Sequence, residues 1–441
     1  MSRSERSDNT QLWRPYVLAA GLLALSGGFL LGGLLFVLRA TGASGDEWQG
    51  AAAQVHGQIQ IVGWGGLMIL GVGLHFLPRM VSVPLARPAA ARAALRLLFT
   101  GLLLHAVCQP LLDDGLSHRV RLAAGAGLIS GALLEIAGAT VVVGLLLRLG
   151  RGMTASAKKR ISPAVVGLIG FGFISLWFAV ALNGLGAAGA AVRGEALIST
   201  RLDSVAVRLG LLGFLVPVSV AMSARLFPLY VATQLPRNRW LTTAALALMS
   251  GLLIRLAGEL AGSGRLNGSG QIIEAIGIAV AAGALRIFER RRTLPRRVVR
   301  IWNDPLQLHL ISAYGWLCCA ALVLLLGGID RLGLEFWRPP LDAERHLIGA
   351  GFVTLLIFGV GSEMLPGFAQ APLRLPRLRW ATLILGNLAV LWRVAPLLLP
   401  ALTASDGRAA IMSVAGLFDA LAIIIFLANL PPRTVPRRSG A

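Results

Sequence analysis

The sequence predicts an all-α, polytopic membrane protein with about twelve transmembrane helices. Three observations support this fold class: 56% of the 441 residues are hydrophobic, only 14% are charged, and apolar runs recur from one end of the chain to the other. A helix needs about 20 apolar residues to cross the hydrocarbon core of a bilayer. We therefore expect residues 1–441 to form a single integral membrane domain in contact with the lipid bilayer.

The expected spans are apolar runs separated by short polar segments. The first run follows a short polar lead and is too long for the core of a signal peptide, so we expect an uncleaved span. The even count puts both termini on one side of the membrane. The runs lie near residues 13–39, 50–78, 93–112, 121–148, 162–187, 203–231, 240–262, 269–289, 305–328, 344–368, 378–401 and 409–431.

The net charge of +21 comes from basic residues that lie mostly between the apolar runs. We interpret this charge as a topology signal and expect no nucleic-acid partner, although contact with anionic lipids is a further role for it. Acidic residues, including Asp203 and those of segment 341–345, fall in the opposite loops. The positive-inside rule then makes the N- and C-termini cytoplasmic. The basic segments on the side of the termini are 87–92, 148–160, 236–239, 289–300, 374–379 and 433–438.

A weak internal repeat organises the chain. "GVGLHFLP" (71–78) matches "GVGSEMLP" (359–366) at five of eight positions, and "AMSARLFP" (221–228) aligns with both on its final proline. These segments close spans 2, 6 and 10, so we expect three four-helix units whose equivalent helices meet around a pseudo-threefold axis. The units cover approximately residues 12–150, 160–300 and 301–432.

Two histidines are candidates for a shared cofactor site. The repeat alignment places Gln58, Arg208 and His346 at one level, so His56 on span 2 and His346 on span 10 lie at about equal depth in the outer third. Two imidazoles on separate helices of a bundle form an axial ligand pair for haem iron. The simpler reading is that each histidine bonds a carbonyl or lines a water-filled cavity.

A haem at this site needs cations for its propionates and small residues along its faces. Arg208 and Arg393 lie at the right depth for the propionates. His105, near Cys108 on span 3, reaches a similar depth and is a candidate metal ligand, although a structural role is the simpler reading. The small residues are Gly57, Gly63, Gly349 and Gly351.

A second polar set is expected near the inner surface. His75, Arg225 and Glu363 occupy equivalent repeat positions, and His309 is a further candidate member. Inter-repeat salt bridges and snorkelling explain such residues simply, whereas a proton or anion path is the functional alternative.

Three other charged residues lie within the expected spans. Two of them have a structural interpretation, and the third has no evident partner. Arg255 and Glu259 are four residues apart on span 7, so we expect them to pair with each other. Glu135 lies near the middle of span 4 without an evident partner, and a role in proton relay is the functional alternative.

Three segments resemble a known group of proteins. "VHGQIQIVGWGGLMILGVGLHFLPR" (55–79), "PVSVAMSARLFPLYV" (217–231) and "RHLIGAGFVTLLIFGVGSEMLPG" (345–367) are similar to the histidine-bearing spans of the NnrS family. This resemblance implies a bacterial inner-membrane protein with a b-type haem, copper as a further candidate cofactor, and partners in respiration or nitric oxide metabolism. NnrS-like proteins tend to have a second histidine where this chain has Gln58.

The twelve-span layout is also similar to the catalytic subunit of haem-copper oxidases and nitric oxide reductases. In those proteins helices 2 and 10 supply both ligands of the low-spin haem, which implies this role for His56 and His346. Their binuclear centre needs further histidines on spans 6, 7 and 10. Here span 6 has arginines, span 7 has no histidine, and Glu344 precedes His346 by two residues. We therefore do not expect gas reduction at such a centre, and enzymatic turnover stays open.

The leading hypothesis is a haem-binding membrane protein, with low-spin haem between spans 2 and 10, that acts in nitric oxide response or electron transfer. Two alternatives stay open. One is a transporter whose site is the inner polar set at the repeat interface. The other is a non-catalytic factor that assembles an oxidase.

Overall fold

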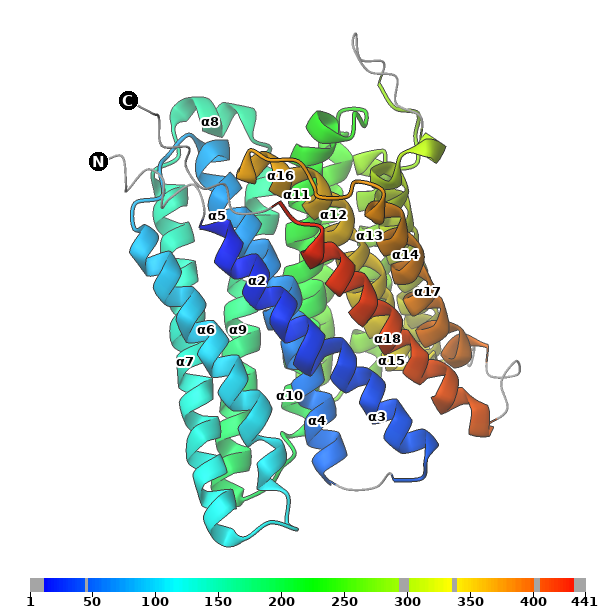
Figure 1. The fold of residues 1–441 in the computed structure, drawn as a ribbon. Helices are drawn as coiled ribbons and strands as arrows, with labels where there is room; N and C mark the ends of the chain where they lie inside the picture. The colour runs from blue at the N-terminus through cyan, green and yellow to red at the C-terminus, as the bar shows by residue number, and fades with distance from the viewer. Residues whose placement is uncertain (1–11, 44–46, 293–300, 335–338, 400–404, 432–441) are drawn as a thin grey trace.

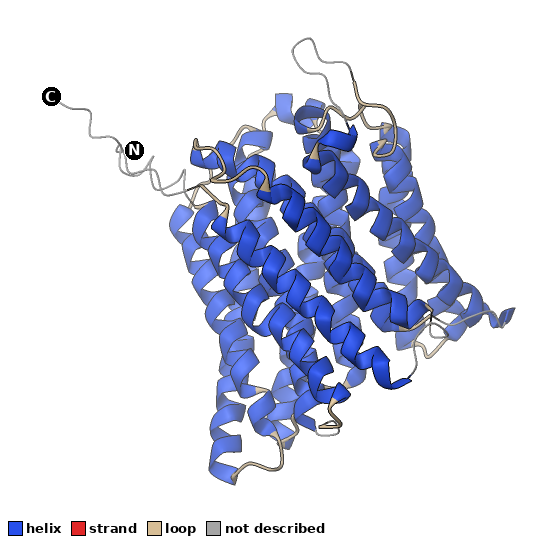
Figure 2. Ribbon diagram, turned by 45° about the vertical axis from the view of Figure 1, so that its right-hand side comes forward, coloured by secondary structure: helices blue, strands red, loops and turns tan. Residues whose placement is uncertain are grey.

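The computed structural model describes residues 12–43, 47–292, 301–334, 339–399 and 405–431. These ranges contain helices and connecting loops, and no strand (Figure 2). Twelve of their helices are long and apolar enough to cross a membrane, so the chain is a multipass membrane protein. The predicted span ends are correct to within six residues, with the largest differences at Arg193 and Leu334. The predicted basic segment 433–438 and residues 293–300 lie outside the described ranges.

Four spans contain a π-helical turn between two α-helices. They are span 1 (α2 Trp13–Leu23, η1 Ala24–Leu30, α3 Leu31–Ala40), span 2 (α4 Glu47–Gln58, η2 Ile59–Gly66, α5 Leu67–Val81), span 6 (α10 Thr200–Arg208, η4 Leu209–Leu215, α11 Val216–Tyr230) and span 10 (α15 Leu341–His346, η7 Leu347–Thr354, α16 Leu355–Ala369). Each π-helical segment contains at least two glycines. Such turns insert an extra residue into the helix and are frequent at functional sites.

The other eight spans are more regular. They are α6 Pro88–Cys108 with η3 Pro110–Leu112, α7 His118–Arg151, α9 Pro163–Arg193, α12 Asn238–Leu260, α13 Gly264–Leu285, α14 Pro305–Ile329 with the π-helical η6 Asp330–Leu334, α17 Leu378–Leu398 and α18 Ser405–Ala428. Two short helices, α8 Ala155–Arg160 and η5 Ile301–Asn303, lie between spans. Figure 1 shows that α2 begins and α18 ends at the same end of the bundle, as an even span count requires.

Spans 2, 6 and 10 form the centre of the bundle. In their apolar windows 78%, 83% and 72% of the residues are buried, whereas no other span exceeds 61%. Their π-helical segments contact one another, and Trp64 of η2 donates a hydrogen bond to the Thr354 hydroxyl of η7 at 3.0 Å. The hairpins α6–α7, α12–α13 and α17–α18 pack around this centre (Figure 1).

The three central spans also end alike. Ser82, Ala232 and Gln370 are the residues four positions after the aligned prolines, and all three have a positive φ, between 53° and 59°. In each span the π-helical segment ends 12 or 13 residues before the proline. These shared features support the three-unit division, whose boundaries stay a prediction.

Candidate functional site

His56 is held by span 1 on two sides of its ring. Its Nδ1 lies 2.9 Å from the carbonyl oxygen of Gly28, where span 1 leaves helical geometry with φ −86° and ψ −108°. Gly32 lies against the ring, and a Cβ there would be 2.7 Å from His56 Cε1. Because a carbonyl oxygen only accepts hydrogen bonds, the His56 proton is on Nδ1 and the Nε2 lone pair is free.

His346 ends α15 and is held by the preceding turn. Its Nδ1 lies 2.8 Å from the backbone carbonyl oxygen of Asp342 and 3.1 Å from the Oδ1 of that residue. Arg393 of α17 donates to Asp342 Oδ2 at 2.6 Å, and its guanidinium lies 4.2 Å from the ring centre of Phe36. A carboxylate behind a histidine fixes the tautomer, so His346 also keeps its Nε2 free.

The two rings face the same space. Their centroids are 6.4 Å apart and their planes differ by 15°. Neither Nε2 has a hydrogen-bond partner among the described residues. Two imidazoles that bind one metal ion from opposite sides, at bond lengths of about 2 Å, have ring centres about 6 Å apart. The spacing therefore fits a shared axial ligand pair.

A cavity of about 720 Å³ surrounds the two histidines. Its walls come from spans 1, 2, 6, 10, 11 and 12. Gly57 and Gly349 line it, and a Cβ at either position would meet nothing within 4 Å. The other two glycines considered from sequence serve packing instead, Gly63 against Leu23 and Gly351 against Trp316.

The charged residues of the cavity are spread along the axis of the helix bundle. Arg39, Arg345 and Arg393 line it, with Arg39 and Arg393 near the ends of α3 and α17 that lie away from the chain termini, and Arg393 has a buried Nη1 without a partner among the described residues. Asp419 of α18 also lines it, is 3% exposed, and has an unpartnered Oδ1. Asp419 lies one turn further inward than Gly416, which packs against span 1 at Phe29. Ten residues separate that level from Arg39, or about 15 Å of helix.

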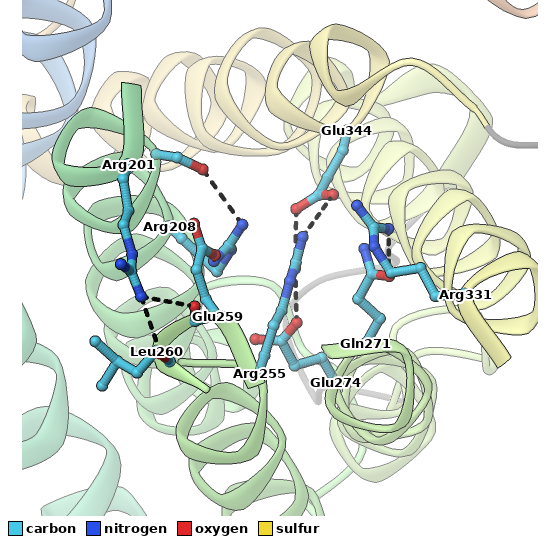
Figure 3. Close-up of polar contacts among 10 residues, drawn as sticks. Arg201, Arg208, Arg255, Glu259, Leu260, Gln271, Glu274, Arg331 and Glu344 are labelled. Carbon is cyan, nitrogen blue, oxygen red and sulfur yellow. Dashed lines mark hydrogen bonds and ion pairs between the residues drawn. The ribbon is translucent and has the colours of Figure 1, made fainter. Parts of the chain in front are cut away.

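Arg208 lies outside the cavity wall, in a buried ion-pair cluster (Figure 3). It is paired with Glu259 of α12. Arg255 bonds Glu274 of α13 at 2.8 Å and both oxygens of Glu344 at 3.2 Å. The predicted pairing of Arg255 with Glu259 is therefore wrong, because carboxylates on neighbouring helices reach Arg255 instead. The cluster joins spans 6, 7, 8 and 10, and its member Glu344 lies two residues before His346 in span 10.

His105 belongs to a closed hydrogen-bond network between spans 2, 3 and 4. Its Nδ1 lies 3.2 Å from Glu135 Oε1 and its Nε2 3.1 Å from Gln109 Oε1. Gln58 donates to the other oxygen of Glu135 at 2.7 Å, and Gln109 donates to Gln54. Glu135 is therefore not isolated, contrary to the expectation from sequence. Both ring nitrogens of His105 are engaged, and the network does not reach the pair of facing histidines.

The inner polar set is only partly assembled. His75 and Glu363 line one cavity of about 450 Å³, and His75 has a buried, unpartnered Nδ1. Arg225 is not in its wall and donates to the Arg160 carbonyl oxygen at 3.5 Å. His309 is fully buried and bonds the Pro305 carbonyl oxygen and the Thr382 hydroxyl.

Several residues of the outer cavity were not found from sequence. Gly28, Gly32 and Asp419 belong to spans outside the repeat alignment, so no equivalent position drew attention to them. The available signal in span 1 was "GGFLLGG" (27–33), two glycine pairs one and a half turns apart. Asp342 was visible four residues before His346, at the spacing that brings two helical side chains together.

The comparisons with known proteins agree with this architecture. The family model described as NnrS protein matches residues 11–437. The chain belongs to the NnrS family. A comparison with curated proteins found no significant match. Among solved structures, a haem-copper terminal oxidase dimer determined by cryo-EM is similar, with a TM-score of 0.62 and 13% identity over 97% of this chain and 85% of the other.

This likeness confirms the oxidase-like fold predicted for the NnrS protein. At 13% identity the similarity concerns the fold alone, and ligands of the oxidase are not transferred with it. The family membership and the oxidase-like arrangement of the spans are therefore established.

Proposed function

We propose that this NnrS protein is an inner-membrane haem protein in which His56 and His346 bind a low-spin, b-type haem between spans 2 and 10. The observation that carries the proposal is the pair of free Nε2 atoms on rings 6.4 Å apart in one cavity. His56 and His346 would hold the haem, which would supply one-electron transfer. The protein then acts in electron transfer or nitric oxide response, together with respiratory or nitric oxide metabolism proteins.

The residues of the cavity fit a haem in size and in charge. Its volume lies within the range of about 300–1,000 Å³ typical of cofactor pockets. Gly57 and Gly349 leave room for a flat ring beside the histidines. Arg393 would hold a propionate through its unpartnered Nη1, and Arg39 and Arg345 add positive charge nearby. Arg208, bound to Glu259, is not needed for this role.

The ion-pair cluster argues against a second metal centre of the oxidase type. Arg208 on span 6, Arg255 on span 7 and Glu344 on span 10 neutralise carboxylates or guanidinium groups rather than converging on an open site. In the described part of the chain, no group of three or more His, Cys, Asp or Glu side chains is placed to hold a metal ion. We therefore leave copper out of the proposal.

A reduced-minus-oxidised visible spectrum of the detergent-purified protein tests this function. We expect a sharp low-spin haem band that is absent from His56→Ala and from His346→Ala. His75→Ala is the matched control, since it removes a histidine from the same span outside the cavity. A wild type without haem after expression with adequate haem, or a band retained in both cavity variants, would overturn the proposal. Copurification with an oxidase without bound haem would indicate an assembly factor.

A transporter is the second candidate, and the inner cavity favours it. His75 has an unpartnered Nδ1 there, and Glu363 lies 3.5 Å from Arg379, too far for a tight ion pair. Flux into proteoliposomes that persists in His56→Ala and His346→Ala but is lost in Glu363→Gln would support transport. An absence of flux, or flux that is unchanged in all three variants, would remove this alternative.

A further inference from the structure

Asp419 has a carboxyl group in the wall of the cavity around His56 and His346, and the proposed binding of haem does not use it. It is 3% exposed, its Oδ1 is buried without a partner, and no ion pair is formed to it by the residues the structure describes. A buried carboxylate without a cation is costly, whereas a neutral carboxyl is tolerated. Whether Asp419 is ionised or neutral therefore depends on the other charges in the cavity.

Six charged or titratable residues share the cavity wall with Asp419, and no ion pair joins any of them to it within the described residues. Those in the cavity wall come from α3, α4, α15 and α17, while α2 and η1, which also pack against α18, add no charged side chain to it in the described ranges. Asp342 is occupied by His346 and Arg393. The set comprises Arg39, His56, Asp342, Arg345, His346 and Arg393.

We propose, resting on the haem function above, that Asp419 carries a proton whose binding is coupled to the oxidation state of the haem. Transfer of one electron from an external one-electron reductant to a haem held by His56 and His346 would remove one positive charge from the cavity. Asp419 would then take up one proton from the solvent and would return it to the solvent on reoxidation. One electron and one proton thus enter together and leave together.

The size of the effect follows from the charge that changes. A unit charge about 10 Å away, at the effective dielectric constant of about 20 that suits protein sites, alters proton affinity roughly tenfold. Arg39 lies about 15 Å of helix beyond the Phe29 level that Gly416 contacts, and no ion pair joins Asp419 to Arg39, Arg345 or Arg393 among the described residues, so none of them holds Asp419 ionised through a direct contact. The charge of a haem held by His56 and His346 would then be the one that changes in the cavity and shifts the proton affinity of Asp419.

Redox titrations of the holoprotein between about pH 5.5 and 8.5 test the proposal. We expect the midpoint potential of the wild type to fall with rising pH within this window, and Asp419→Asn to be independent of pH there. Asp419→Glu should keep the slope, because it keeps the carboxyl. Asp114→Asn, which changes an exposed aspartate in the loop before α7, is the matched control and should behave as the wild type.

Infrared difference spectra of the wild type and of Asp419→Asn provide a second test, which observes the proton directly. Reduction should produce a protonated-carboxyl band, which should be missing from Asp419→Asn. A wild-type potential independent of pH, a slope that persists in Asp419→Asn, or no carboxyl band on reduction would overturn the coupling while leaving the haem proposal intact. A wild type without haem overturns both.

Discussion

His346 in the outer cavity and His105 in the closed network are both intramembrane histidines with a carboxylate beside Nδ1. The carboxylates are Asp342, 3.1 Å away, and Glu135, 3.2 Å away. The difference lies at the second nitrogen. His105 Nε2 is bonded to Gln109, whereas His346 Nε2 has no partner among the described residues and lies in a cavity.

This difference separates a structural histidine from a ligand candidate. Buried polar atoms are almost always bonded, so a network in which every group is used stabilises the fold. The outer cavity instead leaves Arg393 Nη1 and Asp419 Oδ1 unpartnered, which costs stability unless something binds there. A histidine beside a carboxylate is therefore weak evidence for a cofactor, and a free Nε2 in an open space is stronger evidence.

Of the predicted changes, Glu135→Ala should have the largest effect, which is a loss of protein stability. It leaves His105 and Gln58 buried without their shared acceptor, so we expect a loss of about 3 kcal/mol of unfolding free energy. The folded fraction should keep its haem, because the network does not reach the cavity. Denaturant unfolding in detergent, with haem content measured in parallel, checks both statements.

The control for Glu135→Ala is Glu195→Ala, which breaks an exposed ion pair with Arg193. Both of those side chains are about half exposed, so the expected loss is below about 1 kcal/mol. Equal losses in the two variants, or haem lost selectively from Glu135→Ala, would contradict the division between network and cavity.

The sequence predicts the features of the fold that leave a regular pattern along the chain, namely the hydrophobic runs and the internal repeat. Hydrophobic runs locate the spans because the bilayer sets their length, and the repeat aligns spans 2 and 10 so that His56 and His346 meet. Lateral contacts between unlike helices leave no such pattern. Arg255 has a carboxylate four residues away on its own helix, yet it bonds Glu274 and Glu344 on others.

The unpredicted cavity residues have the same physical explanation. Gly28 acts through a carbonyl oxygen released at a helix break, and Gly32 acts through the side chain it lacks. Asp419 matters because its Oδ1 has no partner among the described residues, which becomes apparent only when the neighbouring helices are in place. The sequence made His105 a candidate metal ligand because its two hydrogen-bond partners are not recognisable from sequence. Glu135 reaches it from a different helix, and Gln109 from the turn that follows its own helix.

Gly349→Leu should have an intermediate effect, which is a weaker binding of haem. Gly349 faces the open cavity with nothing within 4 Å of a new Cβ, so the larger side chain should fill ligand space without disturbing the fold. We expect haem affinity to fall at least about tenfold, while the stability of the haem-free protein changes by less than about 1 kcal/mol.

Gly351→Leu is the matched control two residues away. A Cβ at Gly351 would be 2.7 Å from Trp316 Cβ, so overpacking should destabilise the protein by about 2 kcal/mol. Haem titration and unfolding of both variants separate the two results. Unaltered haem affinity in Gly349→Leu would place the ligand elsewhere than beside His346.

Gly32→Ala should have the smallest effect, confined to the orientation of His56. The new methyl group would lie 2.7 Å from His56 Cε1, closer than a Cβ contact allows, so the ring has to shift away from span 1. We expect haem binding to weaken only about threefold, with a changed electron paramagnetic resonance spectrum of the low-spin iron. Gly144→Ala, in span 4 with nothing within 4 Å, shares the gain in helix propensity and should leave the spectrum unchanged. If both variants match the wild type, the contact of span 1 with His56 does not orient the ligand, and the free Nε2 alone defines the site.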